Sequence, residues 1–155
     1  MRTLRLDRLF YAVFIHDAIV HMTSEADLSR AIRTAYLHSK PGGIALFVPD
    51  HTVETFKPNT HHGGHDRGNR SMRYLEWEWD PDPNDTTYLS LMVYVLREGK
   101  DKVQVVHDRS IGGLFSHADW LRLIAEAGFQ SQAVPFEHSE FEPGSCYVFL
   151  GLKRH

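Results

Sequence analysis

The stretch Phe10-Tyr11-Ala12-Val13-Phe14-Ile15-His16 decides the fold of this 155-residue chain. An almost continuous apolar run of this length is typical of a parallel strand that is covered on both faces. A helical apolar pattern follows, which Ser24 is suited to cap and which the breaker residues 40–43 (Lys-Pro-Gly-Gly) are expected to stop. Residues 44–48 form a second buried run. Strand, helix and strand in this order predict a right-handed crossover unit, so we expect an α/β fold.

The middle of the chain has a different pattern. Residues 50–73 are rich in His, Gly, Asn, Thr and Arg, and their lack of a period predicts a long irregular loop. From residue 74 to residue 107, apolar and polar side chains alternate as in strands, and turn-forming residues separate the runs. We therefore predict an antiparallel β-meander inserted between the parallel elements, with Trp77 and Trp79 forming the core beneath it.

The tail returns to the first pattern. Ser116 is placed to cap a helix, with Asp119 three residues later, and Gly128 is expected to end that helix. Residues 130–134 and 146–152 are predicted strands. The acidic loop between them is expected to be solvated surface and carries Glu137, Glu140 and Glu142.

Three pieces of the chain together resemble one family. They are the strand that ends in His16-Asp17-Ala18, the Pro-Gly-Gly turn followed by residues 44–48, and Gly113-Leu114-Phe115-Ser116 ahead of a terminal helix and hairpin. In this order they are similar to the C-terminal half of class I, Rossmann-like S-adenosylmethionine (SAM)-dependent methyltransferases. The resemblance implies a partial methyltransferase sheet, formed by the last parallel strands and a terminal antiparallel hairpin. It also implies SAM as cofactor and a small-molecule methyl acceptor.

The chain departs from the family's pattern at its beginning. Such enzymes bind the cofactor on a glycine-rich loop after their first strand, and an acidic residue after the second strand hydrogen-bonds the ribose hydroxyls. Only nine residues precede the strand at Phe10, and Gly63-Gly64 and Gly112-Gly113 do not follow buried parallel strands. We therefore expect a truncated methyltransferase. A non-catalytic remnant or interaction module of the same fold stays open as an alternative.

Candidate site residues follow from strand ends and from the resemblance. Ligands of parallel α/β sheets bind beyond the carboxyl ends of strands, and the resemblance assigns His16, Asp17 and Ala18 to the cofactor. The alternative is that His16 and Asp17 only finish the strand and bond the following turn. His21 is a candidate general base because an ordinary imidazole titrates near neutrality, although a histidine that merely faces solvent fits the sequence too.

The histidine-rich segment is the other candidate region. The resemblance places the substrate cover of the family after the second parallel strand, so residues 50–107 are expected to form it within a single domain spanning 1–155. His61, His62, His65 and Tyr74 are the predicted acceptor contacts. Imidazole and carboxylate are also good metal ligands, and the segment includes Asp66. His51 and His107 could complete a metal site only if folding brought them close to it. The spacing fits no strong zinc signature, so no metal ligand is assigned, and a metal-binding protein that uses this histidine-rich segment stays a less favoured alternative.

Composition argues against several other functional classes. The net charge of −3 provides no basic field for nucleic acid or an anionic membrane, and no window is long and apolar enough to span a bilayer. Cys146 is the only cysteine, so no intrachain disulfide forms and the cytoplasm is the expected location. Without the preceding strands of the family, the strand at Phe10 would be an exposed edge. We therefore expect a homo-oligomer or a partner chain that covers this edge.

Overall fold

The structure of the chain, a computed structural model, describes residues 1–137, 144 and 146–155. It divides into two compact units. Unit 1 comprises residues 1–56 and 113–155, and unit 2 comprises residues 57–112. Glu140 and Glu142 of the predicted acidic loop lie outside the described residues.

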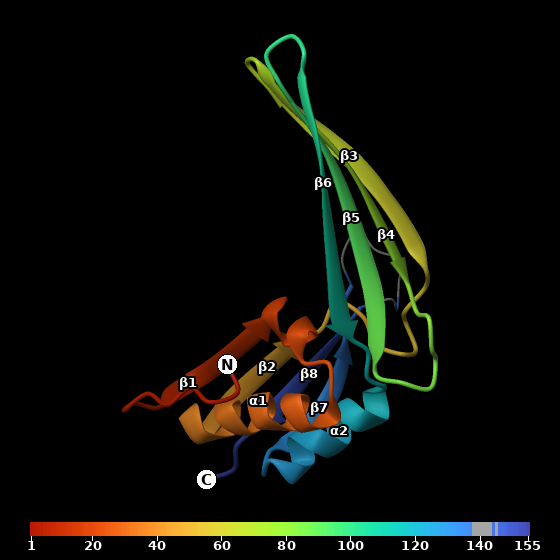
Figure 1. Cartoon of the computed structure of the whole chain (residues 1–155). Coiled ribbons are helices and arrows are strands. Elements are labelled where there is room, and N and C mark those ends of the chain that lie inside the picture. Colours follow the sequence, from red (N-terminus) through yellow and green to blue (C-terminus); the bar gives the residue numbers. More distant parts are fainter. Residues whose placement is uncertain (138–143, 145) are drawn as a thin grey trace. The chain divides into compact units, whose positions relative to one another are not determined.

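Unit 1 is built on a four-stranded sheet with the order β1-β2-β8-β7 (Figure 1). Its strands are β1 (Phe10–His16), β2 (Ser39–Val48), β8 (Tyr147–Leu152) and β7 (Gln130–Pro135). β1 and β2 are parallel, whereas β8 runs antiparallel to both β2 and β7. The predicted parallel crossover and the predicted terminal hairpin are both present, which confirms the fold class.

Two helices cover one face of this sheet. They are α1 (Glu25–His38) and α2 (His117–Glu126), and a 3-10 turn, η1 (Ala18–His21), connects β1 to α1. The predicted caps are formed: the Ser24 and Ser116 hydroxyls accept hydrogen bonds from the third following N–H, and Ser116 and Asp119 complete a capping box. Buried side chains of both helices pack against the sheet through Ala45, Phe47 and Phe149. Alternation along the strands directs Phe14, Ile44 and Leu152 to the opposite face, where all three are exposed.

The start of β2 corrects the sequence prediction. Residues 40–43 were expected to form a turn before the strand, but β2 already begins at Ser39. Gly42 has a φ of 74°, and its N–H donates to the Lys153 carbonyl at 2.8 Å, while the Lys153 N–H donates to Gly43 at 2.9 Å. A register shift opposite β1 absorbs the extra residues. The Pro-Gly-Gly sequence therefore makes an irregularity inside a strand, held by the chain's last residues.

Unit 2 is a four-stranded sheet with the order β3-β4-β5-β6, and it contains no helix. Its strands are β3 (Asn59–Arg67), β4 (Arg70–Trp79), β5 (Thr87–Glu98) and β6 (Lys102–Gly113). The predicted irregular loop 50–73 is thus wrong in its second half. β3 pairs with β4 in antiparallel register from Asn59 opposite Glu78 to Arg67 opposite Arg70. Polar side chains suit an exposed edge strand, and Gly63 leaves room for the Tyr74 ring, so a polar sequence without apolar alternation still forms β3.

The two faces of unit 2 are the reverse of the predicted ones. Trp77 is 50% exposed, whereas Glu78 is only 9% exposed, so the tryptophans do not lie in a core beneath the sheet. Alternation and register place the tryptophans with the odd-numbered side chains of β5, from Leu89 to Val95. The opposite side, here called the tyrosine face, is defined by Tyr74, Glu76, Glu78, Tyr88 and Tyr94.

Among the described residues, no helix has the length and apolar character required to cross a membrane.

Candidate functional site

The candidate site in unit 1 lies at the carboxyl ends of β1 and β2. His16 is the last residue of β1 and stands opposite Val48, the last residue of β2. Asp17 follows the first strand directly, and Asp50 follows the second after one intervening residue. Because parallel strands end at the same edge, the two carboxylates and the imidazole come together there. One ligand atom of each lies within 4.8 Å of the others.

Asp17 carries the clearest backbone signal of function. Its φ is 50° and its ψ is −61°, and it is the only described non-glycine residue with positive φ. An L-residue in such a conformation costs on the order of 1–3 kcal/mol, and residues of this kind concentrate at ligand sites. The side chain makes no cap hydrogen bond to η1, and the turn is closed by the backbone, where Val20 N–H donates to the Asp17 carbonyl at 2.9 Å. The carboxylate therefore does not cap the turn, and one of its oxygens lies 3.0 Å from the His16 Nδ1.

An apolar groove of about 580 Å³ runs along β1 toward this edge. His16 and Ala18 line one end of it, and the ring of Phe14 stacks on the His16 imidazole with centroids 5.9 Å apart. The N-terminal segment forms another part of its lining, where the Leu6 N–H donates to the Nε2 of His38 at 2.9 Å. His16, Asp17 and Ala18, which the resemblance assigns to the cofactor, thus combine hydrogen-bonding groups with an adjoining apolar surface.

His21 and the histidine-rich segment lie elsewhere. His21 is the exposed last residue of η1, four residues beyond Asp17. His61 and His65 lie on the tyrosine face of β3 with Tyr74, whereas His62 points to the other side of the sheet, opposite Leu75. The sheet therefore brings His61, His65 and Tyr74 to one face but separates His62 from them. The three histidines do not converge on a metal, and His16, Asp17 and Asp50 form the only ligand group of three among the described residues.

The tyrosine face places two carboxylates that the sequence analysis did not select, those of Glu76 and Glu78, on the same side as the tyrosine rings. Glu76 accepts a hydrogen bond from the Ser90 hydroxyl at 3.2 Å, and Tyr94 donates to the Met92 sulfur at 3.3 Å. Gly112 faces the ring of Tyr88, which would collide with any Cβ at that position. The face thus combines aromatic rings with two carboxylates. Their signal in the sequence is the polar half of the β4 alternation, on the side opposite the tryptophans that were expected to form the core.

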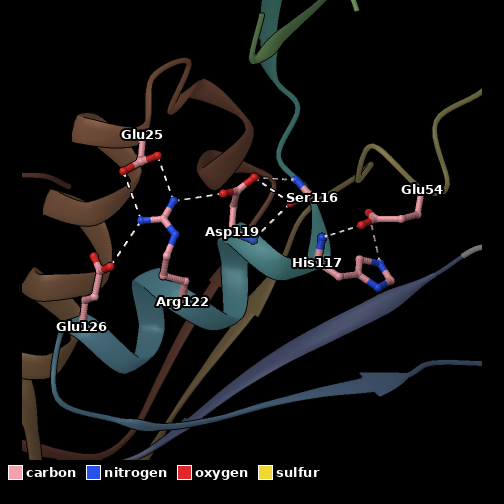
Figure 2. A network of polar contacts seen from close by, with 7 residues as sticks. All are labelled: Glu25, Glu54, Ser116, His117, Asp119, Arg122 and Glu126. Carbon is pink, nitrogen blue, oxygen red and sulfur yellow. Dashed lines mark hydrogen bonds and ion pairs between the residues drawn. The ribbon is translucent and has the colours of Figure 1, made fainter. Parts of the chain in front are cut away.

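A polar network fixes the scaffold around the site in unit 1 (Figure 2). Arg122 of α2 donates to both oxygens of Glu25 on α1, at 3.2 and 2.8 Å. These hydrogen bonds, with further ones to Asp119 and Glu126, raise the pKa of the Arg122 guanidinium above its usual value. The whole network consists of Glu25, Glu54, Ser116, His117, Asp119, Arg122 and Glu126.

The same network anchors the segment that follows β2. The backbone N–H of His117 donates to the Glu54 carboxylate at 2.9 Å, and Val53 N–H donates to the Phe115 carbonyl at 3.2 Å. The His117 ring nitrogen is 3.7 Å from Glu54, too far for a second hydrogen bond. These contacts hold the loop that carries Asp50 against the start of α2.

No family model and no curated protein matches the chain by sequence. Solved structures do match it. DesVI of Streptomyces venezuelae superimposes with a TM-score of 0.82 at 20% identity, over 97% of this chain and 61% of its own. The chain has a methyltransferase fold. The sugar N-methyltransferase KedS8 of Streptoalloteichus sp. ATCC 53650 superimposes with a TM-score of 0.81 at 21% identity, over 99% of this chain and 60% of its own.

SAM-bound CalS10, an amino pentose methyltransferase from Micromonospora echinaspora, gives a TM-score of 0.82 at 16% identity, over 98% of this chain and 61% of its own. The methyltransferase fold predicted from the strand, turn and helix-start motifs is therefore confirmed. The chain spans about 60% of the length of these solved chains.

Proposed function

We propose that this chain provides part of the cofactor site and the acceptor-binding sheet of a SAM-dependent small-molecule methyltransferase. The observation that carries the proposal is the strained Asp17 beside His16, at the carboxyl edge of a sheet that shares its fold with SAM-bound CalS10. Carboxylates accept hydrogen bonds from hydroxyl and amino groups, and the adjoining groove offers apolar surface to a flat ring. When bound, SAM supplies an electrophilic methyl group on a sulfonium.

The acceptor that fits best is an amine. Two carboxylates among three tyrosine rings on the tyrosine face favour a cationic group through charge attraction and cation–π contact. KedS8 is a sugar N-methyltransferase, CalS10 acts as an amino pentose methyltransferase, and MtfA, a further match at 16% identity, is a glycopeptide N-methyltransferase. His61, His65 and Tyr74 remain proposed acceptor contacts on this face.

The chemical step needs an amine with a free lone pair. A protonated amine must first lose a proton to expose that lone pair, and SAM, if held beside His16 and Asp17, would supply the methyl group that the nitrogen accepts. The resulting methylammonium releases its second proton to a base or to water. His21 is the proposed base, because the imidazole side chain is the commonest general base in enzymes. Positioning supplies much of the rate in such an in-line displacement.

We further propose that the cofactor site is completed by polypeptide that pairs with β1. β1 is at the edge of its sheet, and Tyr11 and Phe14 are 70% and 63% exposed. An open edge with exposed aromatic side chains favours pairing with another strand. A strand added there would place its own carboxyl end next to His16 and Asp17. If the chain binds no cofactor, this same edge favours the alternative function of an interaction module.

Calorimetric titration of the purified 155-residue chain with S-adenosylhomocysteine tests the cofactor proposal. We expect saturable binding that Asp17→Ala weakens roughly tenfold, as for loss of one charged hydrogen bond. Asp101→Ala, at an exposed turn of unit 2, is the matched control and should leave the affinity unchanged. A folded chain without binding heat would exclude the cofactor site in this chain and leave the interaction module. Equal losses in both variants would show that Asp17 does not contact the ligand.

A further inference from the structure

Residues 1–9, here called the N-terminal segment, form no helix or strand, yet they supply part of the wall of the groove along β1. The side chains of Met1, Leu4 and Leu6 line this groove and remain 41%, 49% and 44% exposed. Such shallow burial stabilises the segment little. Its polar contacts to α1 therefore decide whether it stays in place.

Two of these contacts anchor the beginning of the segment. The Arg2 guanidinium lies 2.6 Å from the Asp27 carboxylate, and the Arg2 carbonyl accepts a hydrogen bond from the Thr34 hydroxyl at 3.0 Å. Hydrogen bonds from Arg2, and then from Arg30, lower the pKa of the Asp27 carboxyl below its usual value of 3.8. This anchor therefore stays charged over the range in which histidine side chains titrate, about pH 5 to 8.

The third contact depends on the protonation state of His38, which is 6% exposed at the end of α1. Its Nδ1 lies 2.7 Å from the Thr34 carbonyl, which only accepts, so Nδ1 carries a proton. Its Nε2 lies 2.9 Å from the Leu6 N–H, which only donates, so Nε2 keeps its lone pair. Both hydrogen bonds form together only when the imidazole is neutral.

Protonation of His38 turns the third contact into a repulsion. A proton on Nε2 would face the Leu6 N–H, and two donors form no hydrogen bond. Among the described residues, the ring has no acidic partner that would hold its charged form in place. A buried cation without a partner is costly, so the charged ring gains by displacing the segment and reaching water.

The other charges near this end of α1 do not compensate the His38 cation. The Lys153 ammonium donates to the Tyr36 and Ser39 carbonyls at 3.0 Å each, which places a positive charge beside the last turn of the helix. The charged or titratable groups on the elements around His38 are Arg5 and Asp7 on the N-terminal segment, Tyr36 on α1, His16 on β1, Lys40 on β2 and Lys153 after β8.

We propose that His38 is a pH-sensitive switch that holds or releases the N-terminal segment. The neutral imidazole binds Leu6, and the segment then completes one wall of the groove. As the pH falls, protonation releases Leu6 while Arg2 stays anchored on Asp27, so the groove loses the Leu4 and Leu6 side chains from its wall. The consequence for the cofactor rests on the proposed function: a cofactor that occupies this groove binds less tightly in acid.

NMR of the 155-residue chain tests the switch without any ligand. Between about pH 8 and about pH 5, the Leu6 amide signal should shift with the same midpoint as the His38 ring nitrogens. The protection of this amide from hydrogen exchange should fall roughly tenfold, as for loss of one hydrogen bond. At the alkaline end, the ring nitrogen shifts should show the Nδ1–H tautomer.

Matched variants separate His38 from the other histidines. His38→Gln offers a donor and an acceptor at the reach of the ring but does not titrate, so the Leu6 amide should stay protected at every pH. His107→Gln, on an exposed position of β6, is the control and should keep the wild-type response. Circular dichroism establishes whether each variant is folded. Should His38→Gln unfold, the wild-type titration decides the proposal by itself.

Trypsin gives a second readout at a fixed alkaline pH, because Arg5 and Arg8 are cleavage sites within the segment. His38→Ala removes the acceptor of Leu6 and should be cleaved there roughly tenfold faster than the wild-type chain. His38→Gln should be cleaved at the wild-type rate. Equal cleavage of the alanine variant and the wild-type chain would show that His38 does not hold the segment.

Three NMR results would overturn the switch: a Leu6 amide that does not follow the titration of His38, an Nε2–H tautomer at alkaline pH, or a pH response that persists in His38→Gln. Calorimetry with S-adenosylhomocysteine at both ends of the range tests the consequence for the groove. The wild-type affinity should fall roughly tenfold in acid, as for about 50 Å² of lost apolar contact, whereas that of His38→Gln should not.

The calorimetric outcomes also separate this proposal from the proposed function. An equal fall in both proteins would assign the pH dependence to another group, such as His16, and would overturn the coupling between the segment and the cofactor. A folded chain that binds no ligand at either pH would contradict the cofactor site. The Leu6 amide then still confirms or overturns the switch, because that measurement needs no ligand.

Discussion

Unit 1 and unit 2 are both four-stranded sheets, but they bury their side chains in different ways. In unit 1 two helices cover one face, and a cluster that includes Phe47, Trp120 and Phe149 is almost wholly buried. In unit 2 the only buried apolar side chain is that of Tyr88, and both faces carry aromatic residues. Unit 1 is therefore a scaffold that positions strand ends, whereas unit 2 is a sheet whose faces are suited to binding. The following predictions test this difference, from the largest expected effect to the smallest.

Phe47→Ala in β2 should produce the largest loss of stability. Its ring is fully buried between the sheet and the helices, so truncation should lower the free energy of unfolding by about 3–5 kcal/mol. Phe14→Ala in β1 is the matched control, because its exposed ring should contribute within about 0.5 kcal/mol. Urea denaturation followed by circular dichroism gives both values. Similar losses for the two variants would contradict the assignment of the core to one face only.

Gly113→Ala should destabilise unit 1 through a backbone collision. A Cβ at this position would run into the Met22 carbonyl, which cannot turn aside as a side chain can, and we expect a loss of about 1–3 kcal/mol. Gly68→Ala in the β3–β4 turn is the comparison, since it meets no atom within 4 Å and has a φ of 59°. Gly68→Ala should lower the free energy of unfolding only through the unfavourable positive φ, by about 1–2 kcal/mol. Thermal unfolding of both variants should place Gly113→Ala at the lower midpoint.

Ser116→Ala should weaken the start of α2 by about 1 kcal/mol, because it removes a helix cap. The loss should exceed that of Ser24→Ala at α1, where the cap accepts one hydrogen bond but no reciprocal capping box is present. The midpoints of urea unfolding compare the two variants, provided that the dependence of the unfolding free energy on urea concentration is the same in both. A larger loss for Ser24→Ala would mean that the Ser116–Asp119 pair adds nothing to the polar network.

The smallest effect concerns acid titration of the β3–β4 hairpin in unit 2. Hydrogen bonds from Arg73, and then from Ser71, lower the pKa of the Asp66 carboxyl from 3.8 to about 2. The pair therefore contributes stability above about pH 3.8, and this contribution is lost as the pH falls through about 2. Carbon-detected NMR should give this midpoint, and Arg73→Met should move it back toward 3.8. An unchanged midpoint in the variant would show that the pair does not form in solution.

The sequence predicted unit 1 better than unit 2, for physical reasons. Phe10–His16 and residues 44–48 are almost unbroken apolar runs, which was enough to predict two strands and the strand end at His16 and Asp17. The expected burial on both faces was wrong, because Phe14 and Ile44 are exposed on the face that no helix covers. In β4 the alternation gives the period but not the face that points inward, and the tryptophans were placed on the wrong side. β3 could not be found from its own residues, because its pairing with β4 creates the strand.

The candidate site was predictable in part. Position at a strand end was enough to select His16, Asp17 and Ala18. Asp50 was missed because it stands in a polar segment where one carboxylate does not differ from the next. The positive φ of Asp17 leaves no trace in the sequence, since aspartate is common in ordinary turns. The carboxylates of the tyrosine face were missed because the core was expected on the other side of β4, with Trp77 and Trp79.

The most direct test of the central claim, that the strand ends of unit 1 contact the cofactor, is an amide ¹H–¹⁵N NMR titration of the chain with S-adenosylhomocysteine. We predict saturable shifts at Asp17, Ala18 and Asp50, no shifts along β6, and a midpoint at roughly tenfold higher ligand concentration in Asp17→Ala. A folded chain whose spectrum stays unchanged at millimolar ligand, or whose shifts fall outside the carboxyl ends of β1 and β2, would contradict the claim.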